Sequence, residues 1–467
     1  MVAPPQAKMP RFTSSWAKRD SGVATRAWWV ALGWAAVLLA GAKALAWFIP
    51  GSFGFVHEQR LAAFFCLEGI TVLDLSTVVF GPFASQMLAD FGANVIKIES
   101  PDGDIFRAAA PARSPRMGAG YLNLNRNKRS LSLDLKTAEG RAALDRLVAD
   151  ADVFLHNMRP KAIERLDLGY ERLAALNERL IYCAAVGFGS DGPYANDPAY
   201  DDVIQSMTGF ASMNIDPDAE PQLLPTILTD KVAGLYALAG ILGALLSRER
   251  TGRGMAVEAA MFESLASFML VEHLSGHVFE PAEGTLRYDR LTSPHRRPHR
   301  TADGYIAALP YSTRHWVKFL RLIGRDDLAD ADWVCDASRR SERIGELYAV
   351  LAEATPARTS AEWLTEFRRL DIPCGPVNRL EDLLDDPHLA AVDFFQRVDH
   401  PTEGAINTVR QPLRFLGAPS HTDIPAPRLG VDGRKVLHEY GMDDATIDNL
   451  VAAGALYLPQ EHDSSHE

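Results

Sequence analysis

Gly69–Ser100, which reads GITVLDLSTVVFGPFASQMLADFGANVIKIES, carries the strongest indication of the fold. Its first part, TVLDL, is a short β-rich run, and its last part, NVIKIES, alternates apolar and polar residues as a strand does. Between them, GPFASQMLADFG places Pro82 just inside a helix and Gly92 at its end. A strand, a helix and a second strand in this order predict a βαβ unit of a doubly wound sheet.

The same pattern continues further along the chain. KRSLSLDL (128–135), DVFLHN (152–157) and RLIYCAAVGFG (179–189) resemble strands, and TAEGRAALDRLVADA (137–151) resembles a helix that begins at Thr137. Repeated βαβ units predict an α/β fold in which helices cover a parallel sheet. A later run, residues 230–247, is apolar on every face and predicts a central buried helix, closed by RERTGRG.

Composition excludes several classes of protein. The chain has 467 residues, of which 47% are hydrophobic, and a formal net charge of -12, which argues against a general nucleic-acid binder. Its four cysteines are far apart and form no CxxC pair, so we expect neither a metal site nor a disulfide framework. This cysteine pattern fits a reducing compartment, and we expect a cytoplasmic protein.

The N-terminal 62 residues differ from the rest of the chain. Residues 27–49, AWWVALGWAAVLLAGAKALAWFI, are apolar except for Lys43 and are long enough to span a bilayer as a helix. These residues have two explanations. They form a membrane anchor, or they are not part of the functional protein because its start codon has been assigned too far upstream. We favour the second explanation because an anchor before an enzyme body of this kind is uncommon.

Several common ligand-binding motifs are missing from the sequence. The turn after the first strand, STVVFGP, is not a GxGxxG fingerprint, and the chain has no GxxxxGK[ST] loop and no GxSxG elbow. These observations disfavour a dinucleotide-binding Rossmann enzyme, a P-loop enzyme and an α/β-hydrolase.

Asp230 opens the apolar run and has two possible roles. An aspartate at this position is most often a helix N-cap, whose carboxylate accepts hydrogen bonds from backbone N–H groups. A helix N-terminus also favours the ionised carboxylate, so we expect a lowered pKa and a competent nucleophile toward a thioester. Position alone leaves both roles open.

Two basic clusters follow strands of the predicted sheet. NRNKRSLSLDLK (125–136) and HNMRPKAIERLDLG (156–169) each carry several lysines and arginines. Ligands of open α/β sheets bind beyond the carboxyl ends of strands, so these clusters favour a phosphorylated ligand, with a solvated basic edge as the alternative.

Several phrases together resemble the class III coenzyme A transferase family, which includes formyl-CoA transferase and α-methylacyl-CoA racemase. They are the opening stretch itself, LNRNKRSLSLDLKTAEG, NMRPKAIERLDLGYERLAALNERLIY, GFGSDGPYANDPAYDDVIQSMTG, TDKVAGLYALAGILGALLSRERTGRG, RTADGYI and IPCGPV. The resemblance runs from about Leu67 to Leu458, and its motifs are ordered and spread over this length.

The resemblance implies a fold and an assembly. The family has a large doubly wound domain built from both chain ends and a smaller central α+β domain, here 63–280 with 372–467 and 281–371. Two subunits interlock in this family, so a homodimer is expected. Membrane association is expected only if residues 27–49 are a genuine span, and a nucleic-acid partner is not expected.

The resemblance also implies a reaction and its residues. The nucleophilic aspartate of the family falls on Asp230, which would form an acyl anhydride and then an aspartyl-CoA thioester. CoA contacts carry over to Leu133, Lys136, Asn157 and Arg165, and less directly to Arg107. Coenzyme A is then a substrate as acyl-CoA, and no permanently bound cofactor or metal is expected. The turn GFGSDGP (187–193) is a candidate for stabilising oxyanions.

The sequence also departs from the family pattern. Tyr200 stands where the racemase branch has a histidine base, which disfavours racemisation. Val79 and Ser100 replace a glutamine and an arginine of formyl-CoA transferase, and SPHRRPHR (293–300) stands where that enzyme has a glycine-rich loop. These departures put formyl-CoA and oxalate in doubt, and the basic loop fits a dicarboxylate, the CoA phosphates or plain solvent.

The leading hypothesis is a CoA-transferase that moves CoA between carboxylic acids. An acyl-CoA epimerase of the same family and a membrane-anchored CoA-binding protein without turnover are the alternatives. The sequence identifies neither the acyl donor nor the acceptor acid.

Overall fold

The computed structural model of the protein describes residues 65–213, 219–416 and 424–459. The N-terminal extension (1–62) and its apolar segment (27–49) lie outside these residues, so both explanations of that segment stay open. Phe65–Glu467 form one compact unit.

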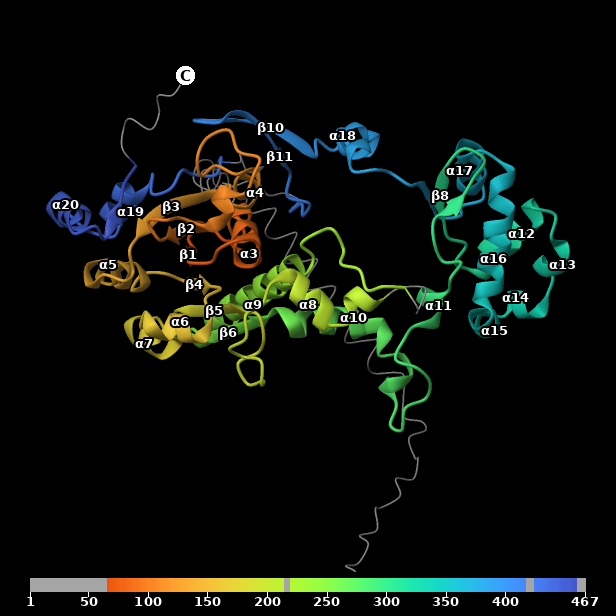
Figure 1. Ribbon diagram of the computed structural model, residues 1–467, viewed down its shortest axis with the longest axis horizontal. Coiled ribbons are helices and arrows are strands. Elements are labelled where there is room, and N and C mark those ends of the chain that lie inside the picture. The colour runs from red at the N-terminus through yellow and green to blue at the C-terminus, as the bar shows by residue number, and fades with distance from the viewer. Residues whose placement is uncertain (1–64, 214–218, 417–423, 460–467) are drawn as a thin grey trace, which may run out of the picture. The chain divides into compact units, whose positions relative to one another are not determined.

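A seven-stranded sheet forms the centre of this unit, in the order β12-β3-β2-β1-β4-β5-β6 (Figure 1). Its strands are β1 (Thr71–Asp74), β2 (Asn94–Glu99), β3 (Lys128–Leu133), β4 (Val153–His156), β5 (Ile181–Val186), β6 (Ala256–Ala260) and β12 (Leu456–Tyr457). Strands β1 to β6 pair in parallel, and β12 runs antiparallel to β3. The prediction of a mostly parallel sheet is therefore confirmed.

Helices cover both faces of the sheet. Successive side chains of a strand point to opposite faces, and in these strands the side chains on both faces are apolar. Val72 belongs to one hydrophobic core and Leu73 to the other. The first core is covered by α3 (Phe80–Asp90), α8 (Asp201–Met207), α9 (Thr229–Thr251) and α10 (Met261–His273). The second is covered by α5 (Ala138–Val148), α6 (Pro160–Arg165), α7 (Tyr170–Leu176), α19 (Gly433–Glu439) and α20 (Asp444–Ala452). Buried strands of a parallel sheet require such two-sided cover.

Helix α9 packs closely against α3, and this contact positions the site described below. Gly234 makes the approach possible, because a Cβ there would lie 3.0 Å from the carbonyl oxygen of Phe80. The helix ends at Gly252, whose φ of 74° fits a left-handed C-cap, as RERTGRG predicts. Among the described helices, α9 alone is long and apolar enough to cross a membrane, but half of its apolar window is buried in the protein.

The prediction that α9 is buried on every face holds for part of the helix. Leu235 and Leu246 are 52% and 58% exposed in the single chain, whereas Ala233, Ala237 and Ile241 are fully buried. An apolar strip of α9 therefore lies at the surface of the isolated chain.

A third hydrophobic core belongs to a lobe of mainly helical residues between Ile306 and Cys374. Figure 1 shows its helices gathered near β8 (Tyr305–Ala308). Its elements are α11 (Asp289–Thr292), β7 (His299–Arg300), β8 (Tyr305–Ala308), α12 (Thr313–Leu322), α13 (Asp326–Ala329), α14 (Asp332–Cys335), α15 (Ala337–Glu342), α16 (Ile344–Ala354), α17 (Ser360–Arg369) and β9 (Cys374–Pro376). The three strands form an antiparallel sheet in the order β7-β8-β9.

The sheet of this lobe extends past the domain boundary predicted between residues 371 and 372, because β9 pairs with β8. The division of the chain into domains otherwise stays a prediction.

The remaining elements are short. They are the helix α4 (Ala119–Leu124), the helix α18 (Pro387–Ala391), the hairpin β10 (Phe395–His400) and β11 (Gly404–Val409), and the 3-10 turns Ile105–Ala108, Phe210–Ser212, Ser275–Val278, Thr355–Ala357 and Glu381–Asp385.

Candidate functional site

The strand order of the sheet has a topological switch point between β1 and β4. The chain adds β2 and β3 on one side of β1, and then β4, β5 and β6 on the other. In open α/β sheets, ligands bind at this switch point, beyond the carboxyl ends of the strands. The turn between β1 and α3, Leu75–Val79, lies at the switch point, as does Asn157, which directly follows β4.

Asn157 holds this turn from the β4 side. Its side-chain nitrogen donates to the carbonyl oxygen of Thr77 at 2.8 Å, and its side-chain oxygen accepts from the Thr77 N–H at 3.0 Å. One amide group thus satisfies both backbone groups of a single residue. The contact ties the two strands that flank the switch point.

An ion pair holds the same turn from the β2 side. Val78 has a φ of 70°, a backbone conformation that a β-branched residue rarely adopts. Its N–H donates to both carboxylate oxygens of Asp104, at 3.1 and 3.2 Å. Asp104 pairs with Lys97 at 3.0 Å, and the Lys97 ammonium also donates to the carbonyl oxygen of Ser76 at 2.9 Å. Because both charged side chains are fully buried, the turn is fixed by groups that cannot relax into solvent.

The turn leads into α3, and the first amide of that helix meets Asp230. The N–H of Phe80 donates to Oδ1 of Asp230 at 3.1 Å. Asp230 is the second residue of α9, so the amino ends of α3 and α9 converge on its carboxylate. Helix amino ends carry partial positive charge, which favours a negative group at this point.

Asp201 resolves the open question of the α9 cap. Its Oδ1 accepts from the N–H groups of Thr229 at 2.5 Å and Asp230 at 3.2 Å, while its Oδ2 accepts from Gln205 at 2.6 Å. Helix α9 therefore takes its cap from a side chain of α8, and Asp230 does not cap it. Within the described part of the chain, Oδ2 of Asp230 accepts no hydrogen bond, whereas Oδ1 accepts one from Phe80.

The pKa of Asp230 differs from the expectation. Burial and the negative charge of Asp201 raise the pKa of Asp230 to about 6, against the lowering effect of the Phe80 N–H. The prediction of a lowered pKa was wrong, because it considered the helix terminus alone and neither desolvation nor a second carboxylate. The group remains mostly ionised at neutral pH.

The residues predicted to contact CoA lie after the carboxyl ends of β3 and β4. Leu133 is buried at the end of β3, and Lys136 is exposed in the loop that follows. Arg165 is exposed at the end of α6, which follows β4. Neither the Lys136 ammonium nor the Arg165 guanidinium has a hydrogen-bonding side-chain partner among the described residues, which leaves both cations available to an anionic ligand.

Arg107 is placed differently from the other predicted contacts. It is 1% exposed, and its guanidinium binds both carboxylate oxygens of Glu99 at 2.7 Å each and lies over the ring of Tyr121. Because breaking a buried ion pair leaves an uncompensated charge, this arginine is fixed in the core. We therefore do not include it among the proposed CoA contacts.

Three cations of the first basic cluster have protein partners. Arg126, Lys128 and Arg129 pair with Asp90, Asp74 and Glu439, respectively. These three residues of the first basic cluster therefore form ion pairs within the protein, whereas Lys136 of the same cluster is exposed.

Two N–H groups of the glycine turn after β5 are already paired with carboxylates of the protein. The N–H groups of Gly189 and Ser190 each donate at 2.9 Å to a carboxylate, of Glu263 and Glu258. Phe80, on the other side of the sheet's switch point, is the backbone donor that reaches Asp230.

Sequence reasoning missed Asp201, Asp104, Lys97 and Phe80. Asp201 lies in AYDDV, where two acidic residues begin α8. This pattern predicts the start of α8. It does not predict that the Asp201 carboxylate also caps α9. Lys97 occupies an alternating strand that reads as half-exposed, although the residue is fully buried.

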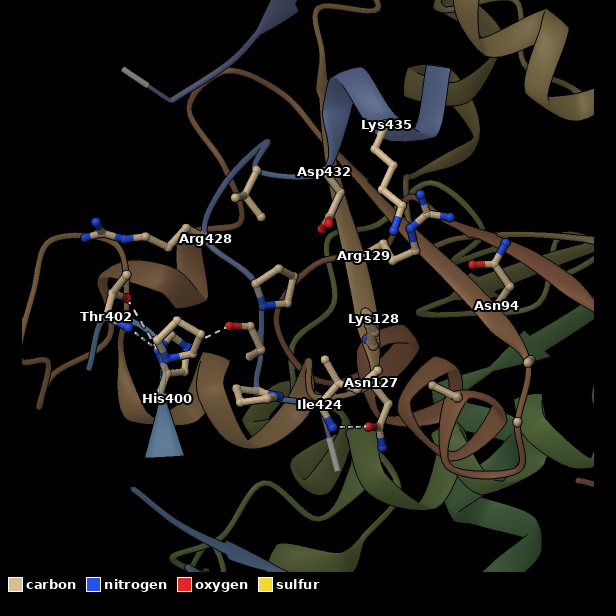
Figure 2. Close-up of a pocket in the computed structure, with 18 residues that line it drawn as sticks. Asn94, Asn127, Lys128, Arg129, His400, Thr402, Ile424, Arg428, Asp432 and Lys435 are labelled. Carbon is tan, nitrogen blue, oxygen red and sulfur yellow. Dashed lines mark hydrogen bonds between the residues drawn. The ribbon is translucent and has the colours of Figure 1, made fainter. Parts of the chain in front are cut away.

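A cavity of about 550 Å³ lies beside the amino ends of β2 and β3 (Figure 2). The Asp230 site, in contrast, lies at the carboxyl ends of the strands. Asn94, Asn127 and Arg129 line it together with Lys435 and His400 of the C-terminal segments. It contains none of the predicted site residues, so this cavity is separate from the Asp230 site.

The described residues include no group of three or more His, Cys, Asp or Glu side chains with the geometry to hold a metal ion.

The chain is similar to known proteins over most of its length. The family model described as CoA-transferase family III matches residues 67–433. The chain is 32% identical over 385 residues to a succinate–glutarate CoA-transferase of Agrobacterium fabrum, which covers 80% of this chain and 95% of that protein. It is 31% identical over 413 residues to a formyl-CoA:oxalate CoA-transferase of Streptomyces avermitilis, which covers 84% and 99%.

A solved structure shows the same fold. The crystal structure of a CAIB/BAIF family protein from Brucella suis matches with a TM-score of 0.67 and 32% identity, over 80% of this chain and 99% of that chain.

Proposed function

Because this chain belongs to CoA-transferase family III, and is thus an enzyme, we propose that it moves CoA from an acyl-CoA to a carboxylic acid through covalent intermediates on Asp230. One observation carries the proposal. The Asp230 carboxylate lies where two helix amino ends converge, and Asp201 caps α9 in its place, so that Oδ2 is left to react.

The reaction divides into two halves with the same chemistry. Oδ2 of Asp230 attacks the thioester carbonyl, the C–S bond breaks, and an acyl-aspartyl anhydride and CoA thiolate result. The thiolate then attacks the aspartyl carbonyl, which releases the donor acid and leaves an aspartyl-CoA thioester. The acceptor carboxylate attacks this thioester, and the released thiolate takes the acceptor acyl group from the new anhydride. Each covalent stage divides one difficult exchange into easier steps.

The Phe80 N–H has a defined role in this scheme. When thiolate attacks the aspartyl carbonyl, negative charge develops on Oδ1, the oxygen that already accepts this hydrogen bond at 3.1 Å. A preorganised donor at the atom that becomes an oxyanion lowers the barrier because it needs no reorganisation. The side chains that hold the 75–79 turn, Asn157, Asp104 and Lys97, keep this donor in place.

Coenzyme A is a substrate in this proposal, and no permanently bound cofactor or metal takes part. Lys136 and Arg165 bind its phosphates, as exposed cations beyond the carboxyl ends of β3 and β4. Leu133 contributes through its main chain, and Asn157 through the turn that it holds. The protein works as a homodimer in the cytoplasm.

The test is exchange activity with a charge-only variant. Asp230→Asn keeps the shape of the side chain and the acceptor for Phe80 but removes the nucleophile, so exchange should fall at least about 10³-fold. Asp202→Asn is the matched control. It also replaces a carboxylate by an amide, but at an exposed position in the first turn of α8, next to Asp201. The proposal is wrong if Asp230→Asn retains a substantial fraction of activity.

Folding of the variant is checked separately by thermal unfolding. Because burial raises the pKa of Asp230, the ionised carboxylate costs stability above about pH 6, and a neutral asparagine removes that cost. Asp230→Asn should therefore unfold at the same or a higher temperature than the native protein at pH 7.5.

A panel of acyl-CoA donors against acids that include succinate, glutarate and oxalate then identifies the substrates.

A further inference from the structure

Lys128, the first residue of β3, has a fully buried ammonium group. Its Nζ donates to three separate parts of the chain: to Oδ2 of Asp74 at 3.1 Å, to the carbonyl oxygen of Pro82 at 3.0 Å and to the side-chain oxygen of Asn125 at 2.9 Å. These acceptors match the three N–H groups of an ammonium. The sequence places Lys128 in a basic cluster, but in the fold all of its donors are used inside the protein.

Asp74, the last residue of β1, links Lys128 to the turn that follows this strand. Its Oδ1 accepts from the N–H of Ser76 at 3.0 Å and also from the Ser76 hydroxyl, and its Oδ2 accepts from the Ser85 hydroxyl of α3 at 2.5 Å. The Asp74 carboxylate is fully buried, like the ammonium. Because the loss of one member of a buried ion pair leaves the other charge uncompensated, each group holds the other in place.

Pro82 connects Lys128 directly to the helix that carries the Phe80 N–H. It is the third residue of α3, and its carbonyl oxygen accepts from the ammonium, so the first turn of this helix is bound to β3. Phe80 is the first residue of the same turn and donates to Asp230 at 3.1 Å. A displacement of the turn changes the length and angle of that hydrogen bond, on which its strength depends.

We propose that Lys128, in its ammonium form, is a positioning residue for the exchange reaction. It fixes the amino end of α3 and so holds the Phe80 N–H against Oδ1 of Asp230, where negative charge develops. The inference rests on the proposed function, because it assigns a role in the reaction on Asp230. It adds a residue that touches neither the substrate nor the reacting atoms.

The charge of Lys128 depends on pH in an accessible range. Burial and the positive charge of Lys97 on β2 lower the pKa of Lys128 to about 8, although Asp74 and Asp104 raise it. Above this pH the neutral amine predominates, which has two N–H groups for three acceptors and leaves Asp74 without its counterion. Exchange should therefore decline above about pH 8.

The first test is the pH profile of the native protein. At saturating acyl-CoA and acceptor acid, kcat should be about fivefold lower at pH 9 than at pH 7.5, with KM for acyl-CoA unchanged within about twofold, because the lost interaction acts in the transition state. A kcat that stays constant up to pH 9 would overturn the proposal.

Thermal unfolding over the same range separates this decline from loss of the fold. The pKa of Lys128 lies below its ordinary value of 10.5, so the folded protein gives up this proton more readily than the unfolded chain. Deprotonation of Lys128 therefore raises the free energy of unfolding between about pH 8 and 10.5. The unfolding temperature should not fall between pH 7.5 and 9, and a fall that parallels the loss of kcat would refute a positioning role.

Lys128→Arg tests whether this residue causes the decline. A guanidinium keeps its charge throughout the range, so the variant should hold kcat constant up to pH 9. Lys318→Arg is the matched control, because Lys318 also donates to a main-chain carbonyl, that of Leu370 at 2.6 Å, but lies in α12. The control should decline above about pH 8 as the native protein does. The same decline in Lys128→Arg would contradict the proposal.

Asn125→Ala answers the same question if the larger arginine prevents folding. Loss of the oxygen that accepts from Lys128 disfavours the ammonium, so the decline should move to lower pH by at least about half a unit. An unmoved decline in this variant would overturn the proposal. Failure here differs from failure of the proposed function, because Asp230→Asn is inactive whether or not Lys128 positions α3.

Discussion

Asp230 experiences two opposing electrostatic effects. The N–H of Phe80 and the amino end of α9 stabilise its negative charge, whereas burial and Asp201 destabilise it, and the second pair prevails. A carboxylate with a raised pKa is a more basic nucleophile than an ordinary aspartate and is still ionised at neutral pH. A pKa of about 6 thus makes the Asp230 carboxylate more basic and still leaves it ionised at neutral pH.

The pH dependence of exchange follows from this pKa. Only the ionised form of Asp230 attacks a thioester, so kcat/KM should be constant near pH 7.5 and decline below about pH 6, the pKa of Asp230 in the free enzyme. The decline should approach tenfold per pH unit. The measurement is kcat/KM between pH 4.5 and 8 with one donor and one acceptor; a profile that stays flat to pH 4.5 contradicts the assignment.

Asp201→Asn should shift this acid limb. The substitution removes the negative charge that raises the pKa of Asp230 but retains an oxygen for the Thr229 N–H, so the midpoint should move to lower pH. It should also cost about 1–2 kcal/mol of stability, because the hydrogen bond to Gln205 is disturbed. Asp202→Asn should leave the midpoint in place, and a shift to higher pH in Asp201→Asn would refute the role given to this carboxylate.

At the scale of elements, the chemistry depends on how α3 and α9 meet. Gly234 allows this approach, since a Cβ there would lie 3.0 Å from the carbonyl oxygen of Phe80. Gly81 allows the turn before α3 to fold closely onto the helix, since a Cβ there would lie 2.2 Å from the Cβ of Ser76. The turn before α3 then carries a strained residue, Val78, which buried hydrogen bonds hold in place. Strain of this kind persists only where the surroundings fix it, and it is concentrated at functional sites.

Asn157→Ala tests the clamp on this turn. Loss of both hydrogen bonds to Thr77 should lower kcat about tenfold, reduce stability by about 1–2 kcal/mol and speed amide hydrogen exchange in residues 75–80. If Asn157 acted only as a CoA contact, KM for acyl-CoA would rise while kcat and hydrogen exchange stayed the same.

The matched control for this variant is Asn177→Ala. Asn177 also holds backbone with its side-chain amide, through Val148 and Ala151, but it lies before the amino end of β5, away from the switch point. Its loss should reduce stability to a similar extent and leave hydrogen exchange in residues 75–80 unaffected.

Sequence reasoning succeeded for these elements where information is local. Periodicity, Pro82 and Gly92 predict the β1–α3–β2 unit, and Thr137 caps α5 as expected. It did not predict the cap of α9, because that carboxylate lies 28 residues before Thr229 and meets it only in the folded chain. The pKa of Asp230 was missed for the same reason, since burial and a second charge are tertiary properties.

At the scale of the whole molecule, the isolated chain exposes an apolar surface. Val271 is 82% exposed, Leu246 58%, Phe268 54% and Leu235 52%, all on α9 and α10. The two helices pack against each other, and large exposed apolar side chains on neighbouring helices indicate a contact with another protein. It supports the homodimer that the family resemblance implies.

Light scattering during size-exclusion chromatography measures this assembly. The molar mass should be twice the chain mass of 51.2 kDa and should not fall on dilution to the nanomolar range, because interlocked subunits dissociate only by unfolding. A mass of one chain at all concentrations would exclude the dimer.

Both explanations of residues 27–49, a membrane anchor or a start assigned too far upstream, stay open, because these residues lie outside the described part of the chain. Sedimentation of the native protein with membranes distinguishes them. Protein that pellets with membranes and is released only by detergent would favour an anchor, whereas protein that stays in the supernatant would exclude one.

The most direct measurement is the mass of the peptide that carries Asp230 after rapid quenching of the enzyme with acyl-CoA in the absence of an acceptor acid. We expect a CoA or acyl adduct on Asp230 that disappears when an acceptor is added and never forms in Asp230→Asn. An unmodified Asp230 peptide during active exchange, or an adduct on another residue, would contradict it.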